Sequence, residues 1–248
     1  MTEFRDWYKS IPFFTRYWLT FTIVLSLLAR FGLVHHHYLI LDAYYFINRF
    51  QIWRAATALF FYPTGFPFMI NCYFLYNYSQ RLESGTFAGK PADYFYMLLF
   101  NWTFCVIIGL LVKLPVLMDA MVLSVLYVWC QLNKEVIVSF WFGSRFKAMY
   151  LPWVLFAFNL IMNGGGVMEL LGILVGHVAF FLLFQYPQEF GGPALLTPPA
   201  FLKQIFPDTR YVGGFGSAPQ ARAGAPPRPA AGMFGGHNWG RGQTLGGN

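Results

Sequence analysis

Charged side chains are scarce in this chain of 248 residues. They make up 11% of it, against 57% hydrophobic and 21% aromatic residues, whereas soluble domains carry about 25% charged residues. So little charge excludes an ordinary water-soluble domain and indicates a protein embedded in a membrane. The net charge of +7 does not indicate a nucleic-acid partner, because the basic residues are scattered along the chain rather than gathered in a patch.

Cysteine is also rare, and its three copies lie far apart in apolar segments, at Cys72, Cys105 and Cys130. Their spacing fits no zinc or redox motif, so we expect them to be packing residues. The chain contains no GxxxxGK run, which excludes a phosphate-binding loop of the Walker type. We therefore expect no metal and no cofactor, and any ATP-driven step would need a separate motor protein.

The apolar residues fall into six blocks that could each cross a bilayer. They lie at about residues 15–34, 65–80, 94–112, 116–131, 148–163 and 167–185. Because about 20 apolar residues cross the hydrocarbon core, several of these blocks are short. The sequence predicts an all-α integral membrane domain with six transmembrane helices over residues 1–186.

The basic residues are divided unequally between the two sides of this predicted bundle. The side that holds both termini carries 13 of the 17 Lys and Arg residues, against Arg30, Arg49, Arg54 and Lys113 on the other side. Lys and Arg are enriched in cytoplasmic segments of membrane proteins. Both termini are therefore predicted to be cytosolic.

Two segments outside the blocks are amphipathic. Residues 1–11 place Phe4 and Trp7 at helical spacing with charged residues between them, which is typical of a helix that lies flat on a membrane surface. Residues 35–64 combine charges with many aromatic side chains, among them Trp53. Such a mixture favours the headgroup layer of the membrane.

Residues 187–248 have a different composition. Glycine and proline supply 22 of these 62 residues, and aliphatic side chains are few. Such a segment cannot bury enough apolar surface to offset the entropy of ordering. The sequence predicts a disordered cytosolic tail.

Several motifs resemble a known membrane family. Trp53 and Arg54, followed by Asn71 and Glu83, resemble the first loop and second span of the rhomboid family of intramembrane serine proteases in identity and spacing. Three further runs are similar to the derlin branch of that family: FLYNYSQRLESG (74–85), SVLYVW (124–129) and GILVGH (172–177). The resemblance covers essentially the whole chain and implies a rhomboid-like bundle of six transmembrane helices in the endoplasmic reticulum membrane.

The residues that make a rhomboid a protease are replaced. Counted from the YVW run at 127–129, the position of the nucleophilic serine falls on Met118, and counted back from Gly172 and Gly176, the position of the histidine falls on Glu169. A thioether and a carboxylate cannot form the hydroxyl and imidazole pair that acyl transfer needs. The resemblance therefore implies a pseudoprotease without catalytic residues.

Two alternative functions remain. Ser124 and His177 could make the chain an active intramembrane serine protease, although Ser124 lacks the flanking glycines and His177 is shifted by eight positions. Alternatively, Glu169 and His177 could relay protons in a small-solute transporter. The chain shows no repeated or broken helices of the kind usual in transporters.

Polar side chains within the predicted spans could line a wet crevice for a client polypeptide. They are Asn71, Asn101, Ser124, Gln131, Asn159, Glu169 and His177. Asp119 and Glu169 either face such a cavity or lie near the luminal headgroups. Gly172 and Gly176 allow two helices to approach closely, which in this family resembles a contact with the fourth span; a self-association face is the alternative.

The predicted tail carries a motif near its end. The run WGRGQTLG (239–246) resembles the box by which derlins bind the valosin-containing AAA ATPase, with Trp239 and Leu245 as anchors and Gly240 and Gly242 allowing close approach of the backbone. The resemblance implies a role in degradation from the endoplasmic reticulum. The expected partners are misfolded client polypeptides, this ATPase, an endoplasmic reticulum ubiquitin ligase complex, membrane lipids, and further copies or other chains in an oligomer.

Overall fold

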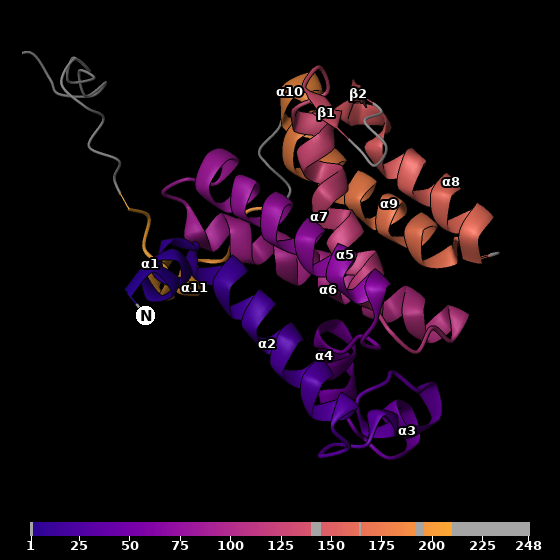
Figure 1. Cartoon of the computed structure of the whole chain (residues 1–248). Helices are drawn as coiled ribbons and strands as arrows, with labels where there is room; N and C mark the ends of the chain where they lie inside the picture. Colours follow the sequence, from indigo (N-terminus) through magenta and orange to yellow (C-terminus); the bar gives the residue numbers. More distant parts are fainter. Residues whose placement is uncertain (1, 140–144, 164, 192–195, 210–248) are drawn as a thin grey trace, which may run out of the picture. The chain divides into compact units, whose positions relative to one another are not determined.

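Helices make up most of the chain (Figure 1). The computed structural model describes residues 2–139, 145–163, 165–191 and 196–209. Within these ranges the only strands are β1 (Ile137–Ser139) and β2 (Arg145–Lys147), which pair antiparallel with Ile137 opposite Lys147. The predicted all-α class is confirmed.

A sharp bend of 116° separates α1 (Thr2–Ser10) from α2 (Phe13–Arg30). Pro12 is the residue before α2, and because proline has no backbone N–H it cannot continue α1. The aromatic side chains of Phe4 and Trp7 on α1 are exposed. That this exposed face lies on a membrane surface stays a prediction.

Short helices connect α2 to the next long helix. They are η1 (His36–Tyr38), α3 (Ala43–Asn48) and α4 (Trp53–Phe60). Figure 1 shows α3 and α4 beside the C-terminal end of α2. Asp42 caps α3 by accepting the backbone N–H of Tyr44 at 2.8 Å. The indole N–H of Trp102 donates to the carbonyl of Ala55 at 2.9 Å, which attaches α4 to α6 (Pro91–Val112).

The helix before α6 is irregular. α5 (Phe66–Phe74) continues through two π-helical segments, η2 (Leu75–Ser79) and η3 (Leu82–Thr86). Such segments are rare and occur frequently at functional sites. The regular helix α6 ends at Val112, and the next residue, Lys113, adopts a left-handed conformation with φ 60°.

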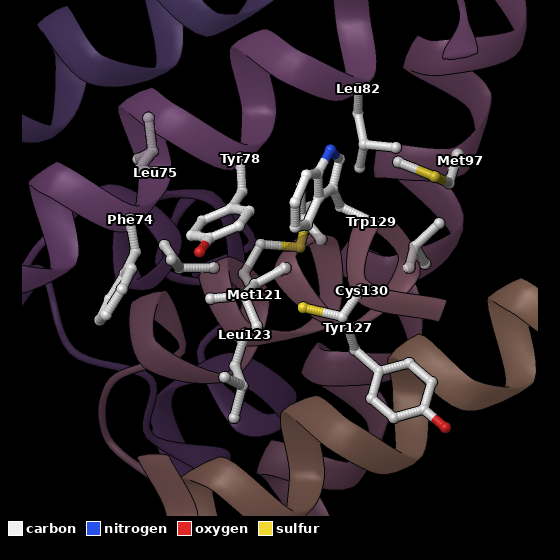
Figure 2. Packing of buried hydrophobic residues seen from close by; sticks show 14 of the residues in the cluster. Phe74, Leu75, Tyr78, Leu82, Met97, Met121, Leu123, Tyr127, Trp129 and Cys130 are labelled. Carbon is white, nitrogen blue, oxygen red and sulfur yellow. The ribbon is translucent and has the colours of Figure 1, made fainter. Parts of the chain in front are cut away.

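The central helix of the core is α7 (Met118–Leu132). Its sequence is apolar on every side, which is typical of a helix that is surrounded by protein, and 12 of its 15 residues are buried. Figure 2 shows Trp129 of α7 beside Tyr78, with the ring of Tyr127 pointing away from Trp129. The ring centroids of Tyr78 and Trp129 lie 5.0 Å apart.

The remaining helices follow the small sheet. They are η5 (Ala148–Tyr150), α8 (Leu151–Asn163), α9 (Val167–Phe180), η6 (Phe181–Gln185), α10 (Tyr186–Phe190) and α11 (Ala200–Ile205). In the described part of the chain, two helices are long and apolar enough to cross a membrane, Pro91–Val112 and Val167–Phe190, and a third is added if α1 and α2 count as one bent span. α7 and α8 are apolar but shorter. The predicted number of six spans stays a prediction.

The packed part of the chain extends beyond residue 186, although a disordered tail is predicted from residue 187 onward. Leu196 and Leu202 are buried, and the ring of Phe206 lies 5.1 Å from that of Phe14 and 5.5 Å from that of Phe95. Three apolar side chains thus anchor a segment whose average composition predicts disorder. The residues of the predicted ATPase-binding box lie outside the described part of the chain.

Candidate functional site

A closely packed pair of helices forms one wall of the site. A Cβ atom added at Gly172 of α9 would lie 2.7 Å from the carbonyl oxygen of Ala120 on α7, and one at Gly176 would lie 2.7 Å from that of Ser124. Real Cβ atoms do not approach backbone oxygens so closely, so only glycine permits this contact. The structure places both glycines between α7 and α9 within one chain.

A cavity of about 460 Å³ adjoins this pair. It lies where α5, α7 and α9 begin and where α8 approaches its end, and its walls are mostly apolar. Its lining includes Tyr62, Phe66, Ile70, Asn71, Asp119, Leu155, Asn159 and Glu169. The volume is within the usual range of ligand pockets in proteins, about 300–1,000 Å³.

Polar groups meet inside this cavity. The side-chain amide of Asn71 donates a hydrogen bond to Asp119, and the hydroxyl of Tyr62 interacts electrostatically with the same carboxyl group. The amide of Asn159 donates to Glu169. Two carboxylates therefore each accept an amide N–H in an otherwise apolar space, and together with Tyr62 they form the polar end of the cavity.

Local structure explains why carboxylates are tolerated there. Asp119 lies in the first turn of α7 and Glu169 in the first turn of α9, where unpaired backbone N–H groups give the helix end a partial positive charge. Burial and the neighbouring Asp119 raise the pKa of the Tyr62 hydroxyl. This phenol therefore remains protonated at neutral pH and can donate to Asp119.

The structure also describes the residues that were predicted to replace the protease pair, and the alternative pair. Met118 is fully buried, and Glu169 is held by Asn159. The hydroxyl of Ser124 donates to the carbonyl of Met121 at 2.8 Å, and the Nδ1 atom of His177 bonds to the hydroxyl of Tyr127 at 2.8 Å. Ser124 and His177 thus each have a partner other than one another.

Comparison with known proteins identifies the architecture. A model of the Der1-like family matches residues 11–200. The chain belongs to this family. It is 50% identical over 251 residues to Derlin-1 of Homo sapiens, with 99% of each chain covered, and 49% identical over 247 residues to Derlin-1 of Drosophila melanogaster, with 98% of each chain covered. A probable derlin-1 homolog of Dictyostelium discoideum is 32% identical over 249 residues, which cover 99% of this chain and all of that protein.

The resemblance to the derlin branch of the rhomboid family is thereby confirmed. The Der1-like family is a rhomboid-like, non-protease family of membrane proteins, and the apolar helices of this chain agree with a multi-pass membrane protein. The cavity is accordingly a feature of a rhomboid-like membrane protein.

The structure brings together only part of the predicted crevice. Asn71, Asn159 and Glu169 line the cavity. Four other residues predicted for it do not line it: Asn101, Ser124, Gln131 and His177. Asn101 and Ser124 are fully buried, whereas His177 is exposed on α9.

One contributor to the polar end, Tyr62, was not predicted from the sequence. It lies outside every apolar block, between α4 and α5, and no local pattern connects it with Asp119.

In the predicted membrane-interface loop, Trp53 is 54% exposed and Arg54 only 1%. The guanidinium of Arg54 donates to the carbonyls of His37 and Ile40 at 2.6 and 3.0 Å, so it fixes the loop from inside.

Proposed function

We propose that this chain is a non-catalytic component of endoplasmic-reticulum-associated degradation. It binds misfolded luminal and membrane proteins and assists their passage to the cytosol. The observation that carries the proposal is the cavity with Asn71, Asp119, Asn159 and Glu169 at its polar end and apolar walls around them. Such a space can accept a polypeptide segment that carries both polar and apolar side chains.

The absence of a protease function is part of the same proposal. Met118 and Glu169 occupy the positions of the nucleophile and the base, and neither can act in that role. Ser124 and His177 do not substitute for them, because each is hydrogen-bonded to a different group. The site therefore binds a client and leaves its peptide bonds intact.

Thinning of the bilayer would lower the barrier to passage. α8, on which Leu160 and Ile161 are exposed, has 13 residues, which corresponds to a length of about 20 Å at 1.5 Å per residue, against a hydrocarbon core about 30 Å thick. A span shorter than the core is accommodated by local thinning of the lipid. The polar end of the cavity would then lie close to the luminal headgroups.

The motor for export is a separate protein. We assign its recruitment to the run 239–246, in which Trp239 and Leu245 act as anchors for the valosin-containing AAA ATPase, with Gly240 and Gly242 in close contact. This assignment requires cytosolic termini, which the distribution of Lys and Arg supports. An endoplasmic reticulum ubiquitin ligase complex is the partner that would mark the exported client.

The test replaces the amides of the cavity in cells that depend on this protein. The double variant Asn71→Leu, Asn159→Leu removes both amide donors while keeping side-chain size. Asn101→Leu is the matched control, because Asn101 is buried outside the cavity. The cytosolic arrival of a misfolded luminal client is measured at equal protein levels.

Export is expected to fall in the cavity variant and to continue in the control. Equal export by the wild type and the cavity variant would contradict the role of the cavity. A cleaved client fragment that depends on the purified protein in liposomes would contradict the non-catalytic role and favour the protease alternative.

A further inference from the structure

The two carboxyl groups at the polar end of the cavity lie close enough to act on each other. Asp119 and Glu169 come from the first turns of α7 and α9. The charge of Glu169 acts on Asp119, and both carboxyl groups act on the hydroxyl of Tyr62. Like charges repel more strongly in apolar surroundings than in water. The pair therefore favours a positive partner.

The cavity itself provides no such partner. Among the described residues, no Lys, Arg or His side chain lines it. The amides of Asn71 and Asn159 donate to the two carboxylates, but an amide is neutral and cannot cancel a charge. A carboxylate that leaves water without a counter-charge is costly, so a positive group that entered the cavity would relieve this cost.

Carboxylates elsewhere in the described chain are different in this respect. Glu135 lies 2.7 Å from the ammonium group of Lys147. Asp93, at the start of α6, interacts electrostatically with Lys203. The pair in the cavity thus combines burial among apolar walls with the absence of a basic side chain from the described lining.

The shape of the cavity favours a basic side chain over an inorganic cation. Ca²⁺ takes about six to eight oxygen ligands, and the described residues contain no group of three or more His, Cys, Asp or Glu side chains that could hold a metal. The cavity of about 460 Å³ is also much larger than an ion. Its apolar walls, which include Phe66, Ile70 and Leu155, suit the apolar stem of Lys or Arg. The guanidinium of Arg has several N–H donors and can bond to two carboxylates at once.

We propose that the cavity selects client segments that carry an Arg or Lys side chain, whose positive group lies between Asp119 and Glu169. This inference rests on the proposed function, because it assumes that the cavity binds clients. Arg and Lys within an apolar segment are costly in a membrane unless they are paired. An unpaired one therefore distinguishes a protein that lacks its proper partner, which is a suitable client for degradation.

The experiment measures binding of designed peptides in phosphatidylcholine vesicles, which carry no net surface charge. The full chain, labelled with a fluorescent donor, is reconstituted with leucine-rich transmembrane peptides that carry an acceptor. The peptides differ only in one residue, placed one helical turn from the end, which is Arg, Lys, Gln or Glu. Because hydrogen bonds to charged groups contribute about 1.5–3 kcal/mol, the Arg peptide should bind at least about tenfold more tightly than the Gln peptide. The Glu peptide should bind most weakly.

Variants of the chain test whether the two carboxylates cause this preference. The double variant Asp119→Asn, Glu169→Gln removes both charges and keeps the size of the side chains, so it should bind the Arg and Gln peptides equally. Each single variant should lose part of the preference. Asp93→Asn is the matched control, because it removes a carboxylate that lies outside the cavity, and it should keep the preference. Circular dichroism checks that each variant remains folded.

Three results would overturn the proposal. They are equal binding of the Arg and Gln peptides by the wild type, a preference that survives in the double variant, and displacement of the Arg peptide by Ca²⁺, which would assign the carboxylates to an inorganic cation. The assay contains no ATPase and measures no export. Loss of the preference while export still depends on Asn71 and Asn159 would refute the selectivity alone. Export that is independent of these amides, with the preference intact, would refute only the proposed function.

Discussion

Glu83 caps the start of α2 by accepting hydrogen bonds from Phe14 and Thr15. Thr15 precedes Glu83 by 68 positions in the chain. Its Oε2 atom accepts the backbone N–H of Thr15 at 2.8 Å and the Thr15 hydroxyl at 2.7 Å, and its Oε1 atom accepts the backbone N–H of Phe14 at 2.9 Å. Ser79 extends the network, because its hydroxyl lies 2.7 Å from that of Thr15 and 2.6 Å from that of Tyr94. Glu83 and Ser79 together thus join α2, the α5–η3 helix and α6.

The first prediction concerns this cap. Glu83→Ala removes the acceptor of two backbone N–H groups, and we expect the free energy of unfolding to fall by about 2 kcal/mol, the range of hydrogen bonds to charged groups and of helix caps. Unfolding titrations in mixed micelles measure the change. Glu3→Ala is the control, because Glu3 is exposed on α1. An equal effect of both variants would contradict the capping role.

The same carboxyl predicts a dependence of stability on pH. Burial raises the pKa of Glu83, which lies beyond the predicted second span, above its ordinary value of 4.5. The folded chain therefore binds this proton more tightly than the unfolded chain. The part of the stability that comes from this raised pKa is complete below pH 4.5 and declines as the pH rises through the folded-state pKa, although the hydrogen bonds from Thr15 and Phe14 oppose part of the decline.

Glu83→Gln tests this dependence because glutamine is similar in size and does not titrate. As the pH is raised from 4.5 toward neutrality, the free energy of unfolding of the wild type should fall relative to that of Glu83→Gln. Unfolding titrations at several pH values measure it. A difference that stays constant over this range would show that the pKa of Glu83 is not raised.

The sequence was sufficient to predict the all-α class and, through the resemblance of its motifs, the family, but not the long-range bonds. Apolar runs mark α6 and α9 because a membrane span must be apolar throughout. Glu83 was recognised only through its match to a family motif, since its partners lie 68 and 69 positions away. Phe206 was missed because one aromatic anchor does not alter the average composition of a segment rich in glycine and proline.

The candidate site could be predicted only in part, because its residues also come together through long-range packing. The rule that polar residues within a span line a crevice correctly selected Asn71, Asn159 and Glu169, which line the cavity. The same rule also selected Ser124 and His177, which do not, because polarity alone does not determine the direction in which a side chain points. That direction depends on how α7 and α9 are rotated against each other, which the contact at Gly172 and Gly176 fixes.

A third prediction concerns this contact. In Gly172→Ala the added methyl group would lie 2.7 Å from the carbonyl oxygen of Ala120, so the helices must separate, and we expect a loss of about 1–3 kcal/mol in the free energy of unfolding. Gly85→Ala is the matched control, because nothing lies within 4 Å of its added Cβ atom. Equal stability of the two variants would contradict the close contact between α7 and α9.

The final prediction concerns the segment that follows the predicted membrane domain. Phe206 packs against Phe14 and Phe95, and Phe14 donates its backbone N–H to Glu83. Since aromatic pairs contribute about 0.5–1.5 kcal/mol each beyond their buried area, Phe206→Ala should release residues 196–206 from the start of α2 and α6. Amide hydrogen exchange in this segment and at Phe14 should accelerate.

Phe201 provides the matched control for that variant. It lies on α11, four positions before the last residue of the helix, but it is 61% exposed. Phe201→Ala should therefore leave amide exchange in residues 196–206 close to that of the wild type. If both variants accelerated exchange equally, helix propensity rather than the Phe14 and Phe95 contacts would hold the segment in place. If only Phe206→Ala did so and exchange at Phe14 also rose, the segment stabilises the beginning of α2 directly.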